Sequence, residues 1–389
     1  MQQASELQIQ IDDVLSCLGS CAGCILTSSE RTITSPDMSW DLLEIIQERT
    51  KNYLEDLEKL NRINITFGIA DHVLMGADYI AKLHKVGSDI ITTGCPSDIE
   101  HSAVFFSTSL VAKPSKVLET LRQVHHSISG PISLIPLVVL DGRITKSIKF
   151  GPRWKSMVHE AKRLFGKVDL SINLSSSGCC DITPHELIAF AKDYNFSELT
   201  VNWAPSLSNA HETIDNIEVI NDWIMEFDTL AQGVEWITTS YRPVIEKTIN
   251  ALKCNGSVSS GQVIKDMMES TIRHSLQFDS FGNLMPKLEA VGDITHAPRH
   301  GLKVMGNIQH NSISEILQQG IGAVERSAMK IHARGCCGSC EYSPICAGTG
   351  FHVATNVVRN TGKYRHKDKC PHLAYNLIRR INSGMQESK

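Results

Sequence analysis

The sequence lacks a long hydrophobic run and an N-terminal export signal. Its first residues, MQQASELQIQIDD, carry neither the basic region nor the apolar stretch of a secretory signal peptide. No apolar segment reaches the roughly 20 residues that a membrane-spanning helix needs. These two absences predict a cytoplasmic protein that does not enter a membrane.

An excess of charge of one sign and internal repetition are also missing. The 389 residues hold 38 Lys and Arg against 42 Asp and Glu, which argues against a general nucleic-acid binder. No fixed-period repeat and no low-complexity tract is present, so a solenoid or a largely disordered chain is excluded. Hydrophobic residues make up 42% and charged residues 21%, as in an ordinary globular protein long enough for two domains.

Cysteine, by contrast, is plentiful, with 12 in the chain. Without export signals, so many cysteines indicate metal or redox chemistry in a reducing compartment rather than disulfides. Cys17, Cys21 and Cys24 have the spacing C-x3-C-x2-C. Three thiolates on one short loop can bind three irons of a [4Fe–4S] cluster and leave the fourth iron without a protein ligand. A zinc site is the alternative, although no fourth Cys or His lies close by in the sequence.

Residues 5 to 205 alternate short apolar runs with amphipathic stretches, the pattern of a parallel sheet or barrel. The runs are rich in Ile, Val, Leu and Thr, as strands buried on both faces require. Strands are predicted at residues 7–12, 63–69, 88–93, 132–140, 169–175 and 198–203. Helices are predicted at 39–60, 115–128, 154–165 and 184–194, the last beginning with Thr183 as N-cap and Pro184. We therefore expect an α/β fold, a partial (β/α)6 TIM-like barrel with the cysteine loop at the C-terminal end of its first strand.

A second group of cysteines lies towards the other end of the chain. Cys337, Cys340 and Cys346 have the spacing C-x2-C-x5-C, and Cys370 follows after 23 further residues. Cys336 is an alternative to Cys337 in this register. Four thiolates are enough to close a metal site, and either zinc or a [4Fe–4S] cluster fits them. The Gly- and Ser-containing segment 254–262 is typical of a linker, so we expect two domains, at 1–255 and 256–389.

The N-terminal cysteine motif resembles that of the radical SAM superfamily, whose core is a partial (β/α)6 barrel. The resemblance implies that Cys17, Cys21 and Cys24 hold a [4Fe–4S] cluster whose open iron binds the amino and carboxylate groups of S-adenosylmethionine (SAM). An electron, supplied by a reductant such as flavodoxin or ferredoxin, then cleaves SAM to methionine and a 5′-deoxyadenosyl radical. That radical abstracts a hydrogen atom from the substrate.

The C-terminal part resembles the SPASM domain, a small α+β cluster domain that follows many radical SAM barrels. Residues 278–293 resemble its opening hairpin, and residues 305–317 resemble its Gly-Asn segment followed by a helix. Two cysteines usual in the family are missing, one replaced by Gly350 and the other near Lys287. The resemblance therefore implies one auxiliary [4Fe–4S] cluster, with a structural zinc as the alternative. Its ligands would be Cys337, Cys340, Cys346 and Cys370.

The same resemblance implies contacts to SAM at the ends of two strands. Gly68 and Asp71 stand where the family has a Gly-Gly-Glu-Pro turn that receives the SAM ammonium, and a helix N-cap is the alternative for Asp71. Asn173 and Ser175 end the strand predicted at 169–175, where they would contact the SAM ribose or carboxylate or simply cap a loop. Cys179 and Cys180 follow as candidate catalytic hydrogen donors, with ordinary packing as the alternative.

Radical SAM enzymes with a SPASM domain most often modify peptides or proteins. The resemblance therefore implies maturation of a ribosomally made peptide by crosslinking, epimerisation or oxidation, with no nucleic-acid or membrane partner. One alternative is a radical SAM enzyme acting on a small molecule. The other is a non-enzymatic iron–sulfur or zinc protein that carries electrons or acts as a sensor.

Overall fold

The protein is described by a computed structural model that places most of the N-terminal two thirds of the chain and parts of the remainder. The described residues are 6–14, 17–18, 38–57, 60–68, 70–95, 99–141, 151–174, 181–203, 217–239, 245–246, 249–250, 274–286, 304–333, 340 and 377–379. Among the helices in these ranges, none is both long and apolar enough to cross a membrane.

A ten-stranded sheet organises the described residues, with the order β10-β9-β8-β1-β2-β3-β4-β5-β6-β7. The strands are β1 (Glu6–Ile11), β2 (Arg62–Phe67), β3 (Ala103–Thr108), β4 (Ser133–Asp141), β5 (Asp169–Leu174), β6 (Glu198–Trp203), β7 (Ile237–Thr239), β8 (Ser275–Phe278), β9 (Asn283–Met285) and β10 (Gly306–Asn307). Strands β1 to β7 pair in parallel with their neighbours, and β8 adds to the free edge of β1, also in parallel. Strand β9 pairs antiparallel with β8 on one side and with β10 on the other.

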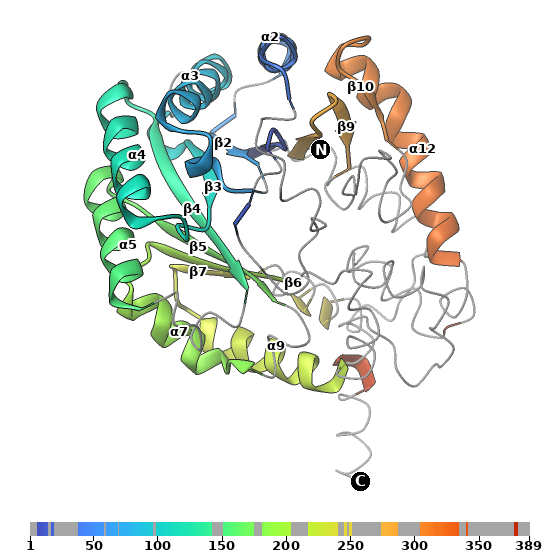
Figure 1. The fold of residues 1–389 in the computed structure, drawn as a ribbon. Helices are drawn as coiled ribbons and strands as arrows, with labels where there is room; N and C mark the ends of the chain where they lie inside the picture. Colours follow the sequence, from blue (N-terminus) through green and yellow to red (C-terminus); the bar gives the residue numbers. More distant parts are fainter. Residues whose placement is uncertain are drawn as a thin grey trace.

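Helices connect the parallel strands and cover one face of the curved sheet, as Figure 1 shows for α2 to α9. They are α2 (Trp40–Glu55), α3 (Ala77–Gly94), α4 (Pro114–Ser127), α5 (Pro152–Phe165), α7 (Pro184–Asp193) and α9 (Ile217–Ala231), with α12 (Ile313–Ala333) after β10 and short 3-10 turns at η1 (His72–Leu74) and η2 (Ile99–His101). The α/β class with a parallel sheet is thus confirmed. The domain boundary near residue 255 stays a prediction.

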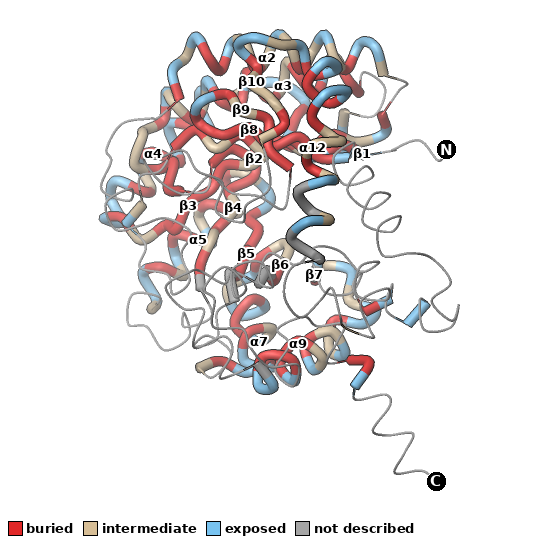
Figure 2. The backbone as a smooth tube through the Cα atoms, turned by 90° about the vertical axis from the view of Figure 1, so that its right-hand side faces the viewer, coloured by how far each residue is buried: buried red, intermediate tan, exposed pale blue. Residues whose placement is uncertain are grey.

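The sheet has an apolar outer face and a more polar inner face. Ile9 of β1 and Ile65 of β2 are fully buried in one cluster with Leu43 and Ile46 of α2. The residues that alternate with these along each strand point to the other face, and Gln10 of β1, for example, is only half-buried. This alternation follows from the period of two along a strand, and Figure 2 shows the buried positions gathered on the strands and the helix faces that cover them. The inner face is therefore free for polar functional groups.

Five of the six predicted strands are confirmed to within about two residues, but the strand predicted at 88–93 is wrong. These residues lie in α3, and the third strand is β3, at 103–108. The apolar pair Ile90-Ile91 followed by Thr92 resembles a strand locally. However, buried residues at helical spacing extend through this segment from Ile80 and Leu83, and the longer helical period prevails.

The predicted start of the helix at 184–194 is confirmed. Thr183 Oγ accepts a hydrogen bond from the Glu186 backbone N–H, and the Glu186 carboxylate accepts one from the Thr183 backbone N–H. This reciprocal pair is a capping box, with Pro184 at the first helical position. The helix predicted at 39–60 begins at Trp40, behind the Ser39 N-cap, and ends at Glu55.

The hairpin predicted at 278–293 is found in part, since the observed hairpin covers residues 275–285 and residues 287–293 lie outside the described residues, while the helix predicted after the Gly-Asn segment is present. Strands β8 and β9 form an antiparallel hairpin whose turn is held by Asp279, which accepts hydrogen bonds from the backbone N–H groups of Phe281 and Asn283. The Gly-Asn segment 306–307 is β10, and α12 follows it and packs against α2. Because β8 pairs with β1, this hairpin extends the barrel sheet.

Asp169, at the start of β5, carries an electrostatic cost that can be tested. Burial, with the nearby Glu198 carboxylate, raises the pKa of Asp169 to about 7 from 3.8, and one of its carboxylate oxygens has no hydrogen-bond partner. Because the pKa of Asp169 is higher in the folded than in the unfolded state, the free energy of unfolding decreases as the pH rises from about 4 to about 7. Asp169→Asn should therefore increase the free energy of unfolding by about 1–2 kcal/mol at pH 8 and by much less at pH 4.5. Urea denaturation at the two pH values measures this, and an equal effect at both would contradict it.

Candidate functional site

Three consecutive parallel strands end together and bring their following residues into one place. Asp13 comes two residues after β1, Gly68 follows β2 directly, and Ser107 lies near the end of β3. The Gly68 backbone N–H donates to the Ile11 carbonyl oxygen at 2.7 Å, which joins the first two strand ends. The C-terminal edge of a parallel sheet is where such folds place their chemistry.

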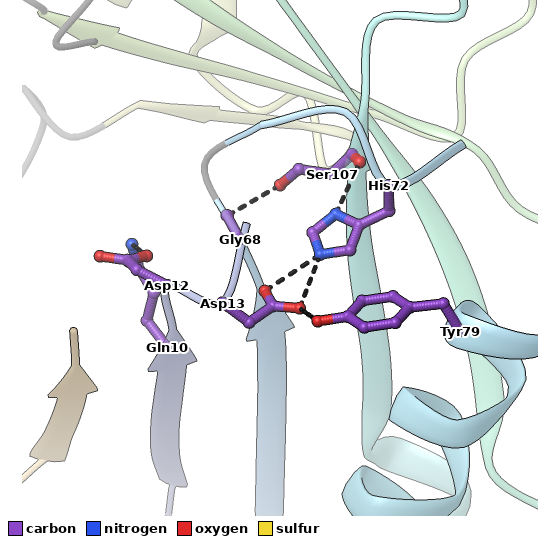
Figure 3. Close-up of polar contacts among 7 residues, drawn as sticks. All are labelled: Gln10, Asp12, Asp13, Gly68, His72, Tyr79 and Ser107. Atoms are coloured by element: carbon purple, nitrogen blue, oxygen red, sulfur yellow. Dashed lines mark hydrogen bonds and ion pairs between the residues drawn. The ribbon is translucent and has the colours of Figure 1, made fainter. Parts of the chain in front are cut away.

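Asp13 and His72 form the centre of this edge (Figure 3). The His72 Nε2 atom lies 3.0 and 3.1 Å from the two Asp13 carboxylate oxygens, and the Tyr79 hydroxyl donates to Asp13 at 2.9 Å. The His72 Nδ1 atom lies 3.0 Å from the Ser107 carbonyl oxygen. Asp13 and His72 are both completely buried. One polar network thus links residues after β1 and β2, the strand β3 and the helix α3.

The partners of His72 determine its charge. Nδ1 faces a carbonyl oxygen and Nε2 faces a carboxylate, an arrangement that favours a proton on both nitrogens. Burial alone lowers the pKa of His72, but Asp13 and the two hydrogen bonds outweigh this and raise it above its ordinary value. The pair is therefore an imidazolium–carboxylate ion pair.

Gly68 lies against the His72 ring and leaves no room for a side chain. A Cβ atom at this position would lie 2.1 Å from His72 Cε1. The backbone φ angle of Gly68 is +74°, in the left-handed region that favours glycine. The Gly68 carbonyl oxygen accepts a hydrogen bond from the Ser107 hydroxyl at 3.0 Å. Glycine is thus required here for two independent reasons.

Asp71, predicted either to receive the SAM ammonium or to cap a helix, has other partners. Its carboxylate accepts hydrogen bonds from the Thr108 hydroxyl at 2.8 Å, the Ser109 hydroxyl at 2.5 Å and the Ser109 backbone N–H at 3.2 Å. Asp71 is fully buried and makes no capping hydrogen bond to η1. Thr108 and Ser109 thus hold both carboxylate oxygens in place, and a contact of Asp71 with the SAM ammonium stays a prediction.

Asp12 points away from Asp13, towards β8 (Figure 3). The side-chain amide of Gln10 donates to it at 2.8 Å and that of Gln277 at 3.3 Å. Burial raises the pKa of Asp12 to about 6 despite these hydrogen bonds, and the Asp13 and Asp279 carboxylates add to the increase. Asp12 therefore keeps its proton to a higher pH than an ordinary aspartate does.

Of the predicted metal ligands, the described residues include Cys17 and Cys340, both half-buried. Cys17 packs against a small cluster of Val14 and Ala70, to which Tyr79 also belongs. It therefore lies close to the Asp13 network. No three His, Cys, Asp or Glu side chains in the described part of the chain converge as metal ligands. The predicted ligands outside the described residues are Cys21, Cys24, Cys337, Cys346 and Cys370.

The remaining predicted site residues are located only in part. The backbone of Asn173 is in β5, so it ends the strand where it was expected. Ser175 and the candidate hydrogen donors Cys179 and Cys180 lie outside the described residues. Their roles stay predictions.

The donor set fits the group that the motif predicts. Cys17 supplies a thiol at the C-terminal edge of the sheet, and the motif spacing puts two more thiols within seven residues of it. Thiolates are the ligands that iron–sulfur clusters take from proteins. Cys17 also remains partly accessible, unlike the fully buried ion pair beside it.

Asp13, His72 and Tyr79 were not predicted from the sequence as site residues. A signal for the first two was present, because Asp13 and His72 are polar residues shortly after apolar strands, where parallel sheets gather functional side chains. Tyr79 lies in the first turn of α3, in a segment for which no helix was predicted, and nothing in the sequence indicated that it would reach Asp13.

Comparison with known proteins gives a likeness in fold. No protein-family profile matches the chain, and no curated protein matches its sequence. A solved structure described as native anSMEcpe with bound AdoMet is similar to it, with a TM-score of 0.51 and 14% sequence identity over 97% of this chain and 99% of that one. At this level of identity the likeness concerns the fold. The chain shares the mixed α/β architecture of a protein solved with AdoMet.

Proposed function

We propose that this chain is a radical SAM enzyme that generates a 5′-deoxyadenosyl radical and abstracts a hydrogen atom from a peptide or protein substrate. The observation that carries the proposal is the position of Cys17. The first cysteine of a C-x3-C-x2-C motif lies just beyond β1, at the functional edge of a parallel sheet. The similarity in fold to a structure with AdoMet bound supports the same reading.

The residues of the chain would provide ligands, position and hydrogen bonds. Cys17, Cys21 and Cys24 would ligate three irons of a [4Fe–4S] cluster. With one electron from a flavodoxin or ferredoxin, the cluster and SAM supply methionine and a 5′-deoxyadenosyl radical. Gln10 and Asp12 would offer a polar inner face to a substrate held at the sheet edge. The auxiliary cluster would be held by Cys337, Cys340, Cys346 and Cys370.

The peptide substrate is supported by the segment after β7. The hairpin β8–β9, the short strand β10 and the helix α12 occur in the order expected for the opening of a SPASM-like domain. Domains of this type most often accompany peptide modification. We therefore expect the substrate to be a ribosomally made peptide.

The first test is SAM cleavage. Anaerobically reconstituted protein, reduced with dithionite and given SAM, should form 5′-deoxyadenosine at least 100-fold faster than protein without the cluster, because one-electron cleavage needs the reduced cluster. Liquid chromatography with mass detection measures the product. A rate equal to that of the cluster-free protein would overturn the enzymatic proposal and favour an electron carrier or a zinc protein.

The second test addresses the substrate class. Hydrogen abstraction transfers a hydrogen atom from the substrate to the 5′-deoxyadenosyl radical, which becomes 5′-deoxyadenosine and leaves a substrate radical. A deuterated ribosomal peptide, chosen from short reading frames that neighbour the gene, should therefore give deuterated 5′-deoxyadenosine and a product of altered mass. Deuterium transfer from a small metabolite, with none from the peptide, would favour the small-molecule alternative.

A further inference from the structure

The buried pair of Asp13 and His72 connects the segment that leads to the cysteines with the glycine turn after β2. We propose that these two are positioning residues, which fix the place of the cysteine loop relative to Gly68. The inference rests on the proposed function, because that loop would carry the SAM-binding cluster. It goes beyond that function by assigning a role to residues outside the cysteine motif.

The first argument concerns the free-energy cost of burying the two charged side chains. Both side chains are completely buried, and each charge has lost its contact with water. A buried ion pair is often no more stabilising than apolar residues of the same size, whereas loss of one partner is strongly destabilising. Stability alone therefore does not account for the pair. Its directional contacts, with Ser107 and Tyr79 as further partners, define a single geometry.

The second argument is what the pair connects. Asp13 precedes Val14, which packs with Ala70 in a small cluster separate from the main core, and Cys17 and Tyr79 contact the same cluster. His72 lies directly against Gly68 on the other side. A shift of either member would move the start of the cysteine loop relative to the glycine turn. The network thus acts at the point where both loops leave the sheet.

The third argument is that the turn is held from two directions. The Gly68 N–H is bound to the Ile11 carbonyl oxygen, and its carbonyl oxygen is bound by the Ser107 hydroxyl. Ser107 also accepts from His72 through its carbonyl oxygen. Loss of the Asp13 charge would leave the buried imidazolium unpaired. The His72 ring would then be free to move, and its contact with Gly68 would be lost.

The test compares Asp13→Asn with His84→Gln in the protein without metal or SAM. His84 is a matched control, since it is a buried histidine of α3 whose Nε2 lies 3.0 Å from the Ile132 carbonyl oxygen and 3.3 Å from the Ser88 hydroxyl, so its hydrogen bonds among the described residues do not involve Asp13. Hydrogen exchange of the peptide 66–75 should be at least about tenfold faster in Asp13→Asn than in wild type. In His84→Gln it should change by less than about threefold. Equal exchange in the two variants would overturn the inference.

A second readout uses the reconstituted protein. Asp13→Asn should keep the wild-type iron content but bind SAM at least about tenfold more weakly by equilibrium dialysis, whereas His84→Gln should bind it within about twofold of wild type. If Asp13→Asn does not fold, Tyr79→Phe takes its place in the binding measurement, because this substitution removes only the hydroxyl group bonded to Asp13. We expect about threefold weaker SAM binding, and wild-type affinity would overturn the inference. Failure of wild type to bind SAM would instead count against the proposed function, while the exchange comparison still decides on the positioning role.

Discussion

Replacing Cys17, Cys21 and Cys24 together by alanine is expected to abolish SAM cleavage and to lower the iron content from about eight to about four atoms per chain. The three thiolates would be the only protein ligands of one cluster, so their loss removes that cluster completely. The second cluster would keep its own four ligands. Iron and acid-labile sulfide analysis after anaerobic reconstitution measures the change, together with 5′-deoxyadenosine formation.

Cys95→Ala is the matched control for this experiment. Cys95 is buried at the end of α3, where its thiol donates to the Leu60 carbonyl oxygen at 3.1 Å, and it belongs to neither predicted cluster. We expect this variant to keep about eight irons and the wild-type rate of SAM cleavage. A triple variant that retains about eight irons would contradict the assignment of the N-terminal ligands. Zinc in place of iron would favour the structural zinc alternative.

Gly68→Ala is expected to destabilise the protein by about 3–5 kcal/mol. A methyl group here must displace the buried His72 ring, and the alanine must also adopt a φ angle of +74°. Displacement of the ring would break its ion pair with Asp13. Urea denaturation of the metal-free protein measures the loss, and the peptide 66–75 should exchange its amide hydrogens faster in the variant.

Gly166→Ala separates the two causes. Gly166, which follows α5, has a φ angle of +75°, almost the same as that of Gly68, but nothing lies within 4 Å of a Cβ atom there. Its substitution should therefore cost only the backbone strain, about 1–2 kcal/mol. Similar losses in the two variants would mean that His72 does not confine Gly68, and would weaken the argument for the network.

Much of the fold could be predicted because local and global signals agree. Strands β1, β2, β4, β5 and β6 are apolar runs between amphipathic helices, and the capping residues of α7 mark its start in the sequence. The strand predicted at 88–93 was wrong because Ile90 and Ile91 fit either a strand or the buried face of a helix. Only the packing of α3 over β2 and β3 decides between the two.

The parts of the site that depend on the spacing of residues in the sequence could be predicted. Those that depend on contacts between residues far apart in the sequence could not. The C-x3-C-x2-C motif identifies candidate iron ligands from the sequence alone, and Gly68 was singled out because its turn resembles a motif of the radical SAM family. The ion pair of Asp13 and His72 was not, because 58 residues lie between its members in the sequence and the strand order brings them together. For Asp71 the sequence allowed a SAM contact or a helix N-cap, and it did not indicate the hydrogen bonds that its oxygens accept from Thr108 and Ser109.

Low-temperature EPR of the reduced, reconstituted protein with and without SAM is the most direct test of an open iron on a cluster held by Cys17, Cys21 and Cys24. If SAM binds that iron, its addition should change the g values of the signal that the triple alanine variant lacks, and leave the auxiliary signal as it was. A spectrum that SAM does not change would contradict an open iron, and with it the radical chemistry proposed for this chain.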